Sequence, residues 1–425
     1  MARYTLVQGT PKARSYHWVA WTLFIGLLVL VAFAYADTGQ LNVLENSYSV
    51  SLTRLDKAIA FIIAVLGMQV VVGYTGQLAL GQSFFFGTGA YLAAWLVEDQ
   101  HWPWLATLVV VIPVCFVLGF LVGIPALRIK GLYLALVTLG LAAIFPSLVQ
   151  LDSLDEYTAG AAGKKVNSDI NAPGWLPLDG IANVFQKIPF FGQYFGDGDL
   201  SSSDADRIWK FFVFTVVGAI CFWMVANLIK SRPGRAIRAI RDNETSAAVS
   251  GVHLSRYKTL SFGVASALGG VGGIVYVAEL GIASPGDFTQ LLSIFFIVGL
   301  VVGGVGTLSG AVVGGIVIAF VPEWSSSTTD VPGVPERWLQ GPTGTLVLGI
   351  LLILLTFVLP GGIVAGVRKM RARVVRVTPA PPSSPAGADS TPPRVVSDTP
   401  DQLDEQRRDP NTELEDVSAT TAPPG

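Results

Sequence analysis

Residues Ala58–Val97 read AIAFIIAVLGMQVVVGYTGQLALGQSFFFGTGAYLAAWLV and contain no charged side chain. A helix needs about 20 apolar residues to cross the hydrocarbon core of a bilayer, so this stretch is long enough for two crossings. Charged residues make up only 14% of the 425-residue chain, whereas soluble domains contain about 25%. The mean hydropathy of +0.56 agrees with that difference. The composition therefore predicts a membrane protein.

Seven further stretches are apolar and uncharged, and the one that begins at Leu291 is again long enough for two crossings. With Ala58–Val97 they predict about ten transmembrane helices and an all-α, polytopic membrane fold. The seven stretches are Trp18–Ala36, Trp104–Leu127, Gly131–Leu151, Phe211–Ile229, Thr259–Ala278, Leu291–Pro322 and Thr343–Val367.

The first of these stretches is expected to be a membrane span and not a cleaved signal. Trp18–Ala36 is longer than the apolar region of about 7–15 residues in a signal peptide, although Ala34-Tyr35-Ala36 resembles a cleavage site. The two cysteines, Cys115 and Cys221, lie inside apolar stretches. We expect them to be small buried hydrophobes, with no disulfide or metal framework.

Basic residues predict the orientation, because they concentrate in the cytoplasmic loops of membrane proteins. They gather near residues 3–14, 128–130, 230–258 and 368–376, while the loop from Asp152 is acidic. Ten spans place the four basic clusters on one side, so both termini are expected in the cytoplasm and the spans in the plasma (inner) membrane. The predicted organisation is a cytoplasmic N-terminus 1–17, a transmembrane domain 18–367 with an extracytoplasmic loop 152–207 and a central cytoplasmic segment 231–258, and a cytoplasmic tail 368–425.

Two of these regions leave their roles open. The loop 152–207 is long for a simple connection, and it suits either a docking surface for an extracytoplasmic partner or a tolerated insertion. The tail 368–425 is first basic and then rich in Pro, Ser, Thr and Asp. Its acidic part has too few apolar residues to offset the entropy of ordering, so we expect it to be disordered.

Glycine has two different patterns in the spans. Gly306, Gly310 and Gly314 are four residues apart, as are the pairs 269/273 and 299/303, and this spacing lets membrane helices approach closely. Between residues 73 and 89, glycines alternate with polar residues. That pattern predicts either a broken or re-entrant helix that lines a cavity or is buried in protein, or a plain cytoplasmic hairpin turn between two spans.

The apolar stretches contain no Asp, Glu, Lys, Arg or His. Carriers that are coupled to protons or sodium need ionisable groups within the membrane. The three histidines, His17, His101 and His253, are scattered and form no catalytic constellation. The chain is therefore predicted not to be an enzyme, and if it transports a solute uphill, the energy comes from another subunit.

The central segment Ser231–Lys258 reads SRPGRAIRAIRDNETSAAVSGVHLSRYK. Pro233 suits the first turn of a helix that carries arginine at every third position and an apolar stripe at Ile237 and Ile240. Asp242-Asn243 is expected to break this helix and cap a second short helix, which Gly251 ends. Such an element suits a groove on a cytoplasmic partner. The alternative is a basic loop that touches lipid headgroups.

At this point the chain resembles a known family. Gly234–Gly251, GRAIRAIRDNETSAAVSG, is similar to the cytoplasmic coupling segment of the LivM-like permeases of branched-chain amino acid ABC importers. The spacing of Glu244, Ala247 and Gly251 resembles the glutamate–alanine–glycine signature of ABC-importer permeases. Other similar pieces, over about residues 58–367 and in the family's order, are Gly73–Gly89 (GYTGQLALGQSFFFGTG), Ile124–Gly140 (IPALRIKGLYLALVTLG), Ser284–Ser293 (SPGDFTQLLS), Gly303–Gly310 (GGVGTLSG) and Leu359–Gly362 (LPGG).

The resemblance implies a permease subunit that works with a second homologous permease, two cytoplasmic ATPases and an extracytoplasmic binding protein. ATP would bind to the ATPases, and this chain would need no cofactor and no metal. Alternating access would follow from movement of the coupling segment. The residues implied in that segment are Arg235, Arg238, Arg241, Asp242, Asn243, Glu244, Ala247 and Gly251; those implied along the translocation pathway are Gly73, Tyr74, Gly76, Gln77, Gln82 and Phe85.

The sequence departs from the family at three places. Gln82 stands where many members have histidine, the outer loop is longer than usual, and the acidic tail is extra.

Other functions compete with amino acid import. Permeases for urea and short amides share most of these motifs, so they are the first alternative. A passive channel for a small neutral solute is the second, and a membrane scaffold is the third.

Overall fold

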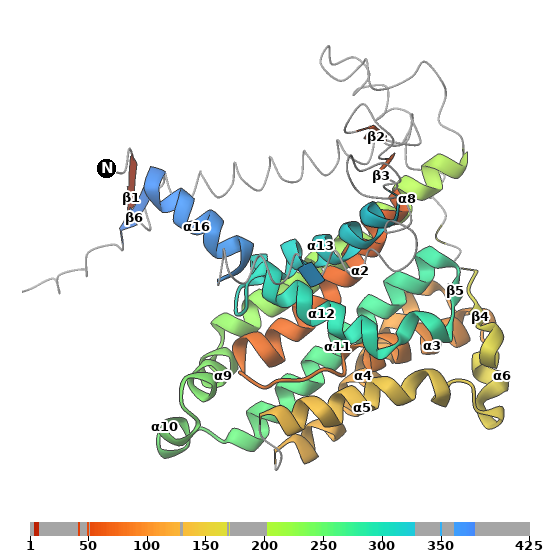
Figure 1. The fold of residues 1–425 in the computed structure, drawn as a ribbon. Helices are drawn as coiled ribbons and strands as arrows, with labels where there is room; N and C mark the ends of the chain where they lie inside the picture. Colours follow the sequence, from red (N-terminus) through yellow and green to blue (C-terminus); the bar gives the residue numbers. More distant parts are fainter. Residues whose placement is uncertain are drawn as a thin grey trace, which may run out of the picture. The chain divides into compact units, whose positions relative to one another are not determined.

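The computed structural model describes residues 52–127, 131–167, 170, 202–327, 349–350 and 361–378, together with three short strands nearer the N-terminus. Helices dominate these residues (Figure 1), which confirms the predicted all-α class. Two-residue strands pair antiparallel as β2 with β3 and as β4 with β5. The strands are β1 Tyr4–Val7, β2 Leu41–Asn42, β3 Ser49–Val50, β4 Lys164–Lys165, β5 Ile282–Ala283 and β6 Val375–Thr378.

The helices follow the apolar stretches, although many begin or end beyond them. The long and medium helices are α2 Leu52–Met68, α3 Gln82–Glu98, α4 Trp104–Ala126, α5 Leu132–Leu148, α8 Ser202–Lys230, α9 Arg232–Asp242, α11 Leu254–Leu280, α12 Gln290–Gly303, α13 Leu308–Ser327 and α16 Gly362–Val374. The short ones are η1 Gln69–Tyr74, η2 Asp152–Leu154, α6 Asp155–Thr158, η3 Gly160–Ala162, α10 Glu244–Val249 and η5 Pro285–Phe288.

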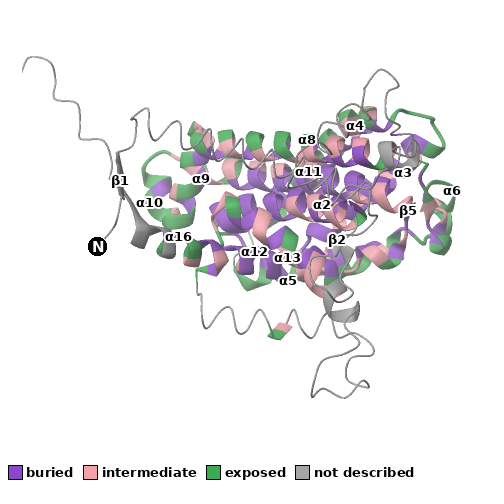
Figure 2. Cartoon of the chain, turned by 90° about the horizontal axis from the view of Figure 1, so that it is seen from above, coloured by how far each residue is buried: buried purple, intermediate pink, exposed green. Residues whose placement is uncertain are grey.

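Two helices form the centre of the bundle. Buried residues cover most of α2 and α11 (Figure 2), and α11 packs against α2, α3 and α4. Aromatic side chains fill the space between these helices and α12, with Phe86 of α3 at 5.4 Å from Tyr276 and from Phe296 between ring centroids. Cys115 and Cys221 are buried free thiols, as predicted.

The predicted span count is tested for only part of the chain. Among the described residues, four helices are long and apolar enough to cross a membrane: Leu52–Tyr74, Trp104–Pro125, Asp206–Lys230 and Leu254–Leu280. A fifth candidate joins Leu132–Leu148 to Asp152–Thr158 through a 73° bend. The predicted span Trp18–Ala36 and most of Thr343–Val367 lie outside the described residues. The total of about ten therefore stays a prediction.

The stretch Leu291–Pro322 was predicted to cross the membrane twice, and it forms two helices with a break between them. Helix α12 has 14 residues, which gives a length of about 21 Å, so it is shorter than the hydrocarbon core of about 30 Å. The two helices pack closely through glycine, because a side chain at Gly303 would clash with the carbonyl of Gly310. Gly306 lies in the break, not on a helix face, with φ +75°.

The region 73–89 is a broken element and not a plain hairpin. Helix α2 continues as the π-helix η1 to Tyr74, and residues 75–81 then run back without helical structure (Figure 1). Helix α3 starts at Gln82, whose Nε2 donates hydrogen bonds to the carbonyls of Ala64 and Ala265 at 3.1 Å. Because Ala64 lies ten residues before Tyr74, the chain returns about 15 Å along α2 before α3 begins.

Two side-chain hydrogen bonds tie this returning segment to the neighbouring helices. The Thr138 hydroxyl accepts from the Leu80 amide at 2.8 Å, and the Thr75 hydroxyl donates to the Val70 carbonyl at 2.8 Å. Non-helical backbone is tolerated at membrane depth only where such partners or a water-filled cavity are present. The segment therefore meets the physical condition for a broken span.

The end of the bundle opposite to α9 contains ionisable groups that the apolar stretches did not include. Helix α2 begins early enough to bury Asp56, which is 2% exposed, and α8 and α11 bring Lys210 and Glu279 within 3.7 Å of each other. Strand β4 pairs with β5 nearby, and Lys164 contacts Asp99 at 2.8 Å. The apolar stretches themselves contain no ionisable residue, but the helices extend beyond them and so carry ionisable residues at their ends.

Helices extend into two of the predicted regions, whose boundaries stay predictions. Helix α8 begins at Ser202, inside the predicted loop 152–207. Helix α16 continues to Val374, inside the predicted tail 368–425, and β6 follows it. The first residues of the predicted tail are thus helical because they extend a helix that begins at Gly362, and residues after 378 lie outside the described part.

Candidate docking segment and translocation route

The central segment forms two capped helices, as the sequence predicted. The Ser231 hydroxyl accepts a hydrogen bond from the Gly234 amide at 3.4 Å, and Pro233 occupies the first turn of α9. Ile237 and Ile240 are buried, so they fix α9 to the bundle. The helix ends because Asn243 adopts an extended conformation with φ −160°.

Asn243 also starts the second helix. Its side-chain oxygen accepts from the Ser246 amide at 2.9 Å, which caps α10. Gly251 has φ +82° and its amide donates to the carbonyl of Ala248, so it ends α10 in the way expected for a glycine after a helix. Ala247 is buried between α10 and its neighbours. Both helices lie beyond the end of α8 in Figure 1.

The surface of this segment combines charge with one large apolar side chain. Arg235, Arg238, Arg241 and Asp242 are exposed. Val249 is 85% exposed, the highest value among the large exposed hydrophobic residues of the described chain. The carboxylate of Glu244 is only partly exposed and lies 2.6 Å from the Lys258 ammonium. The exposed residues are accessible to a partner, and their docking role stays a prediction, while Glu244 and Ala247 have structural contacts within this chain.

Two of the arginines bond to backbone carbonyls at helix ends. Arg238 donates to the carbonyl of Ile229 at 2.9 Å, which ties α9 to the end of α8. Arg241 donates through Nη1 to the carbonyl of Gly73 at the end of η1. Helix C-termini leave carbonyls without partners and favour nearby cations, so both contacts are physically favourable.

Helix η1 is also bonded to the break between α12 and α13. Its first residue, Gln69, has no exposed area; it donates to the carbonyl of Gly304 at 3.0 Å and accepts from the amide of Gly306 at 2.8 Å. At the other end of η1, the Tyr74 side chain lies near the backbone of Leu308. Two breaks that are more than 200 residues apart in sequence thus share one network of hydrogen bonds.

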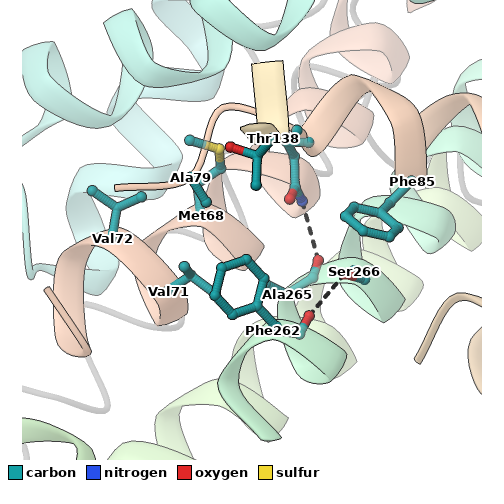
Figure 3. Close-up of a pocket in the computed structure, with 11 residues that line it drawn as sticks. Met68, Val71, Val72, Ala79, Phe85, Thr138, Phe262, Ala265 and Ser266 are labelled. Atoms are coloured by element: carbon teal, nitrogen blue, oxygen red, sulfur yellow. Dashed lines mark hydrogen bonds between the residues drawn. The ribbon is translucent and has the colours of Figure 1, made fainter. Parts of the chain in front are cut away.

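The predicted pathway residues occupy different positions in this region (Figure 3). Gln82 and Phe85 line a cavity of about 20 Å³ with Thr138, Phe262 and residues of α2. A water molecule needs about 10–15 Å³ by the same measure, so the cavity has room for about one water. Gly73 and Tyr74 lie at the end of η1 and not in the cavity wall, and Gly76 lies against Arg241.

Gln77 differs from the other polar residues of the pathway set. It is 7% exposed, and neither its Nε2 nor its Oε1 has a hydrogen-bond partner in the described structure. Gln82, in contrast, uses its amide to join α3 to α2 and α11. The amide of Gln77 is therefore buried and unpaired, whereas that of Gln82 is engaged in the fold.

Sequence reasoning did not identify Gln69, Val249 or Lys258. A glutamine within the apolar run VLGMQVVVG is a visible signal for Gln69, because a buried amide needs partners. The signal for Val249 is an apolar residue at the end of a short polar helix. The sequence contains no signal for Lys258, because its ion pair with Glu244 depends on how α10 folds against α11.

The fold and this segment define a class of protein: a polytopic, all-helical membrane protein with an exposed, charged element at one end of its bundle. Among the described residues, no group of three His, Cys, Asp or Glu side chains is placed to hold a metal ion. Residues 52–356 match the family model described as branched-chain amino acid transport system, permease component. The chain therefore belongs to this family.

Curated relatives agree with the family. The chain is 30% identical over 260 residues to the high-affinity branched-chain amino acid transport system permease protein LivM of Escherichia coli K12, covering 61% of this chain and 59% of that protein. It is 29% identical over 301 residues to LivM of Salmonella typhimurium LT2, covering 70% and 66%. It thus matches about three fifths to two thirds of their length. LivH of Escherichia coli K12 is 29% identical over 139 residues, covering 31% and 40%. No solved structure matches the chain.

Proposed function

We propose that this chain is the permease subunit of an ATP-driven importer of branched-chain amino acids in the inner membrane, with both termini in the cytoplasm. The observation that carries the proposal is the α9–α10 segment. Its helices are capped locally, its arginines and Val249 are exposed, and it lies at the end of the bundle that also carries the basic helix α16. A lipid-binding loop would explain the arginines, but it would not need an ordered second helix with an apolar tip.

The proposed complex contains a second homologous permease, two cytoplasmic ATPases and an extracytoplasmic binding protein. The ATPases bind ATP, so this chain performs no catalysis and needs no cofactor. Arg235, Arg238, Asp242 and Val249 meet the ATPase, while Asn243, Ala247 and Gly251 hold the segment in shape. Glu244 acts through its ion pair with Lys258.

Substrate passes beside the returning segment 75–81 in this proposal. The cavity at Gln82 and Phe85 has room for about one water, so the described conformation is closed to an amino acid and transport requires the wall to move. The wall is mostly apolar, which suits a branched aliphatic side chain. The buried, unpaired amide of Gln77, which such a movement would expose, is the group that we assign to the polar part of the substrate.

The docking proposal is tested by Val249→Asp in the full complex. A carboxylate at the apolar tip cannot enter an apolar groove without a large desolvation cost. We expect capture of the ATPase by the purified permease pair, and leucine uptake into proteoliposomes, to fall by at least about tenfold.

Val249→Ala is the matched control, because it shortens the side chain without adding charge. It should retain most of the uptake. Normal ATPase capture and normal uptake by the Val249→Asp complex would show that α10 is not the docking element.

The substrate is tested by competition. Uptake of labelled leucine by the wild-type complex should be inhibited by isoleucine and valine and should not respond to equal concentrations of urea or acetamide. Inhibition by urea or acetamide and none by valine would assign the chain to the urea and amide group instead. Solute flux through the purified chain without ATPase or ATP would indicate a channel.

A further inference from the structure

The contacts of Arg241 connect the docking segment to both helix breaks. Its guanidinium donates to the carbonyl of Gly73, and its aliphatic part lies against Gly76 at the start of the returning segment. A side chain at Gly306 would collide with the same guanidinium, so Arg241 also touches the break between α12 and α13. One side chain on α9 thus contacts two interruptions of the membrane helices.

The position of Arg241 explains why this contact is sensitive to movement of α9. Helix η1 ends at Tyr74, so the carbonyl of Gly73 has no amide partner one turn further along the chain. Arg241 lies in the last turn of α9, next to the point where Asn243 starts α10. A shift of α9 therefore changes the contact directly, because no other residue lies between the guanidinium and the two breaks.

The breaks are themselves joined, so they are placed to move together. Gln69 bonds the backbone of Gly304 and of Gly306, and the Tyr74 side chain lies near the backbone of Leu308. The breaks also contain glycines with positive φ, namely Gly76, Gly304 and Gly306. Such backbone can change its dihedral angles at low steric cost, which is what a hinge requires.

We propose that Arg241 is the positioning residue that transmits displacement of α9 to the returning segment 75–81 and to the break 304–307. The proposal rests on the proposed function, because it assumes that an ATPase docks on α9–α10. It goes beyond docking, since Arg241 acts inside the permease and not on the ATPase surface. Loss of Arg241 should uncouple ATP hydrolysis from transport, while the permease and the ATPase stay associated.

The test uses the full complex with binding protein in proteoliposomes and compares Arg241→Gln with Arg232→Gln. Arg232 is an exposed arginine at the first residue of the same helix, so its replacement removes the same charge. We expect Arg241→Gln to keep ATPase capture and ATP hydrolysis within about twofold and to lower leucine uptake by at least about tenfold. Arg232→Gln should resemble the wild type, and Arg241→Lys, which keeps one donor for the Gly73 carbonyl, should recover part of the uptake.

Hydrogen exchange gives a readout that a purely structural role of Arg241 would not change. In the wild-type complex, ATP should alter exchange in α9 and, together with it, in residues 69–81 and 304–310. In Arg241→Gln the response should persist in α9 and disappear from the two breaks. A wild-type complex in which α9 responds and the breaks do not would overturn the proposal even if the variant fails to fold.

The outcomes also separate this proposal from the proposed function. A wild-type complex without ATP-dependent uptake, or a chain that captures no ATPase, contradicts the proposed function. An active wild type combined with an Arg241→Gln complex that has an unchanged ratio of uptake to hydrolysis contradicts only the role of Arg241. Loss of ATPase capture in Arg241→Gln would overturn it as well, because Arg241 would then be a docking residue.

Discussion

Helices α11 and α4 have similar lengths and apolar character but opposite environments. In the most apolar part of α11, with a mean hydropathy of 1.7, 83% of the residues are buried; in α4, with a mean hydropathy of 2.9, only 22% are buried. The more hydrophobic helix is therefore the more exposed one. In a bilayer, lipid is as apolar as a protein interior, so close packing and hydrogen bonds, and not hydropathy, decide which helix is central.

Small residues produce this difference. Close neighbours leave no room for a side chain at Gly270 or Gly273 of α11. The two glycines of α4, Gly119 and Gly123, both face α11, at Ser266 and Thr259. The rest of α4 presents large exposed side chains such as Val109 and Leu121. Glycine position thus predicts the contact face better than hydrophobicity does.

Filling a glycine of α11 with a side chain is the most severe test of the packing difference between α11 and α4. Gly273→Val would place a side chain against the carbonyl of Phe86 on α3, a backbone atom that cannot move aside. We expect a loss of more than about 3 kcal/mol, or no folded protein at all. The same substitution at Gly140 of α5, where nothing lies within 4 Å, should be tolerated. The thermal unfolding temperature and the yield of monodisperse protein in detergent are measured for both variants. Equal stability of Gly273→Val and Gly140→Val would show that close packing at Gly273 does not stabilise the bundle.

A large-to-small pair tests burial on the same two helices. Ile274 of α11 is fully buried, and Ile274→Ala should cost about 2–5 kcal/mol because it leaves a cavity. Leu121 of α4 is 54% exposed, and Leu121→Ala should change stability by less than about 0.5 kcal/mol. The difference in unfolding temperature between the variants checks this. If Leu121→Ala were the more destabilised of the two, α4 would have to be central instead.

Removing the amide of Gln69 tests how much the buried hydrogen bonds at the continuation of α2 contribute to stability. Gln69→Leu leaves the carbonyl of Gly304 and the amide of Gly306 without this partner, and we expect a cost of about 2 kcal/mol. Gln150→Leu is the control, because its bond to the Pro146 carbonyl is exposed to solvent and its loss should cost less than about 0.5 kcal/mol. The free energies of unfolding of the two variants are compared in detergent. Equal losses would show that the buried hydrogen bonds of Gln69 stabilise the protein no more than the exposed bond of Gln150.

The smallest expected effect concerns α10, which is held by local caps instead of deep packing. Asn243→Ala removes the bond to the Ser246 amide and should destabilise α10 by about 1 kcal/mol. Hydrogen exchange of the α10 amides should accelerate while that of α11 stays unchanged. Asn243→Asp keeps a capping oxygen and should behave like the wild type. Faster exchange throughout α11 in Asn243→Ala would mean that α10 supports the bundle.

The features that the sequence predicted correctly depend on short-range signals. The two helices around Asn243 follow from a proline, a capping side chain and a glycine, all within about 20 residues, and these act through neighbouring backbone groups. The apolar stretches predicted where most helices lie, although not their ends. Helix ends moved because charged residues such as Asp56 can continue a helix when other helices cover them.

The all-α membrane class, the two capped helices around Asn243 and the glycines that permit close approach follow from the sequence, because each depends on local geometry or on apolar length. The three-dimensional packing was needed to find which helices are central, where α3 begins, and that Gln69 and Arg241 join two distant breaks. The partners of Gln69 lie 235 and 237 residues away. No local pattern encodes such a pairing, since it exists only when α2, α9, α12 and α13 meet at one end of the bundle.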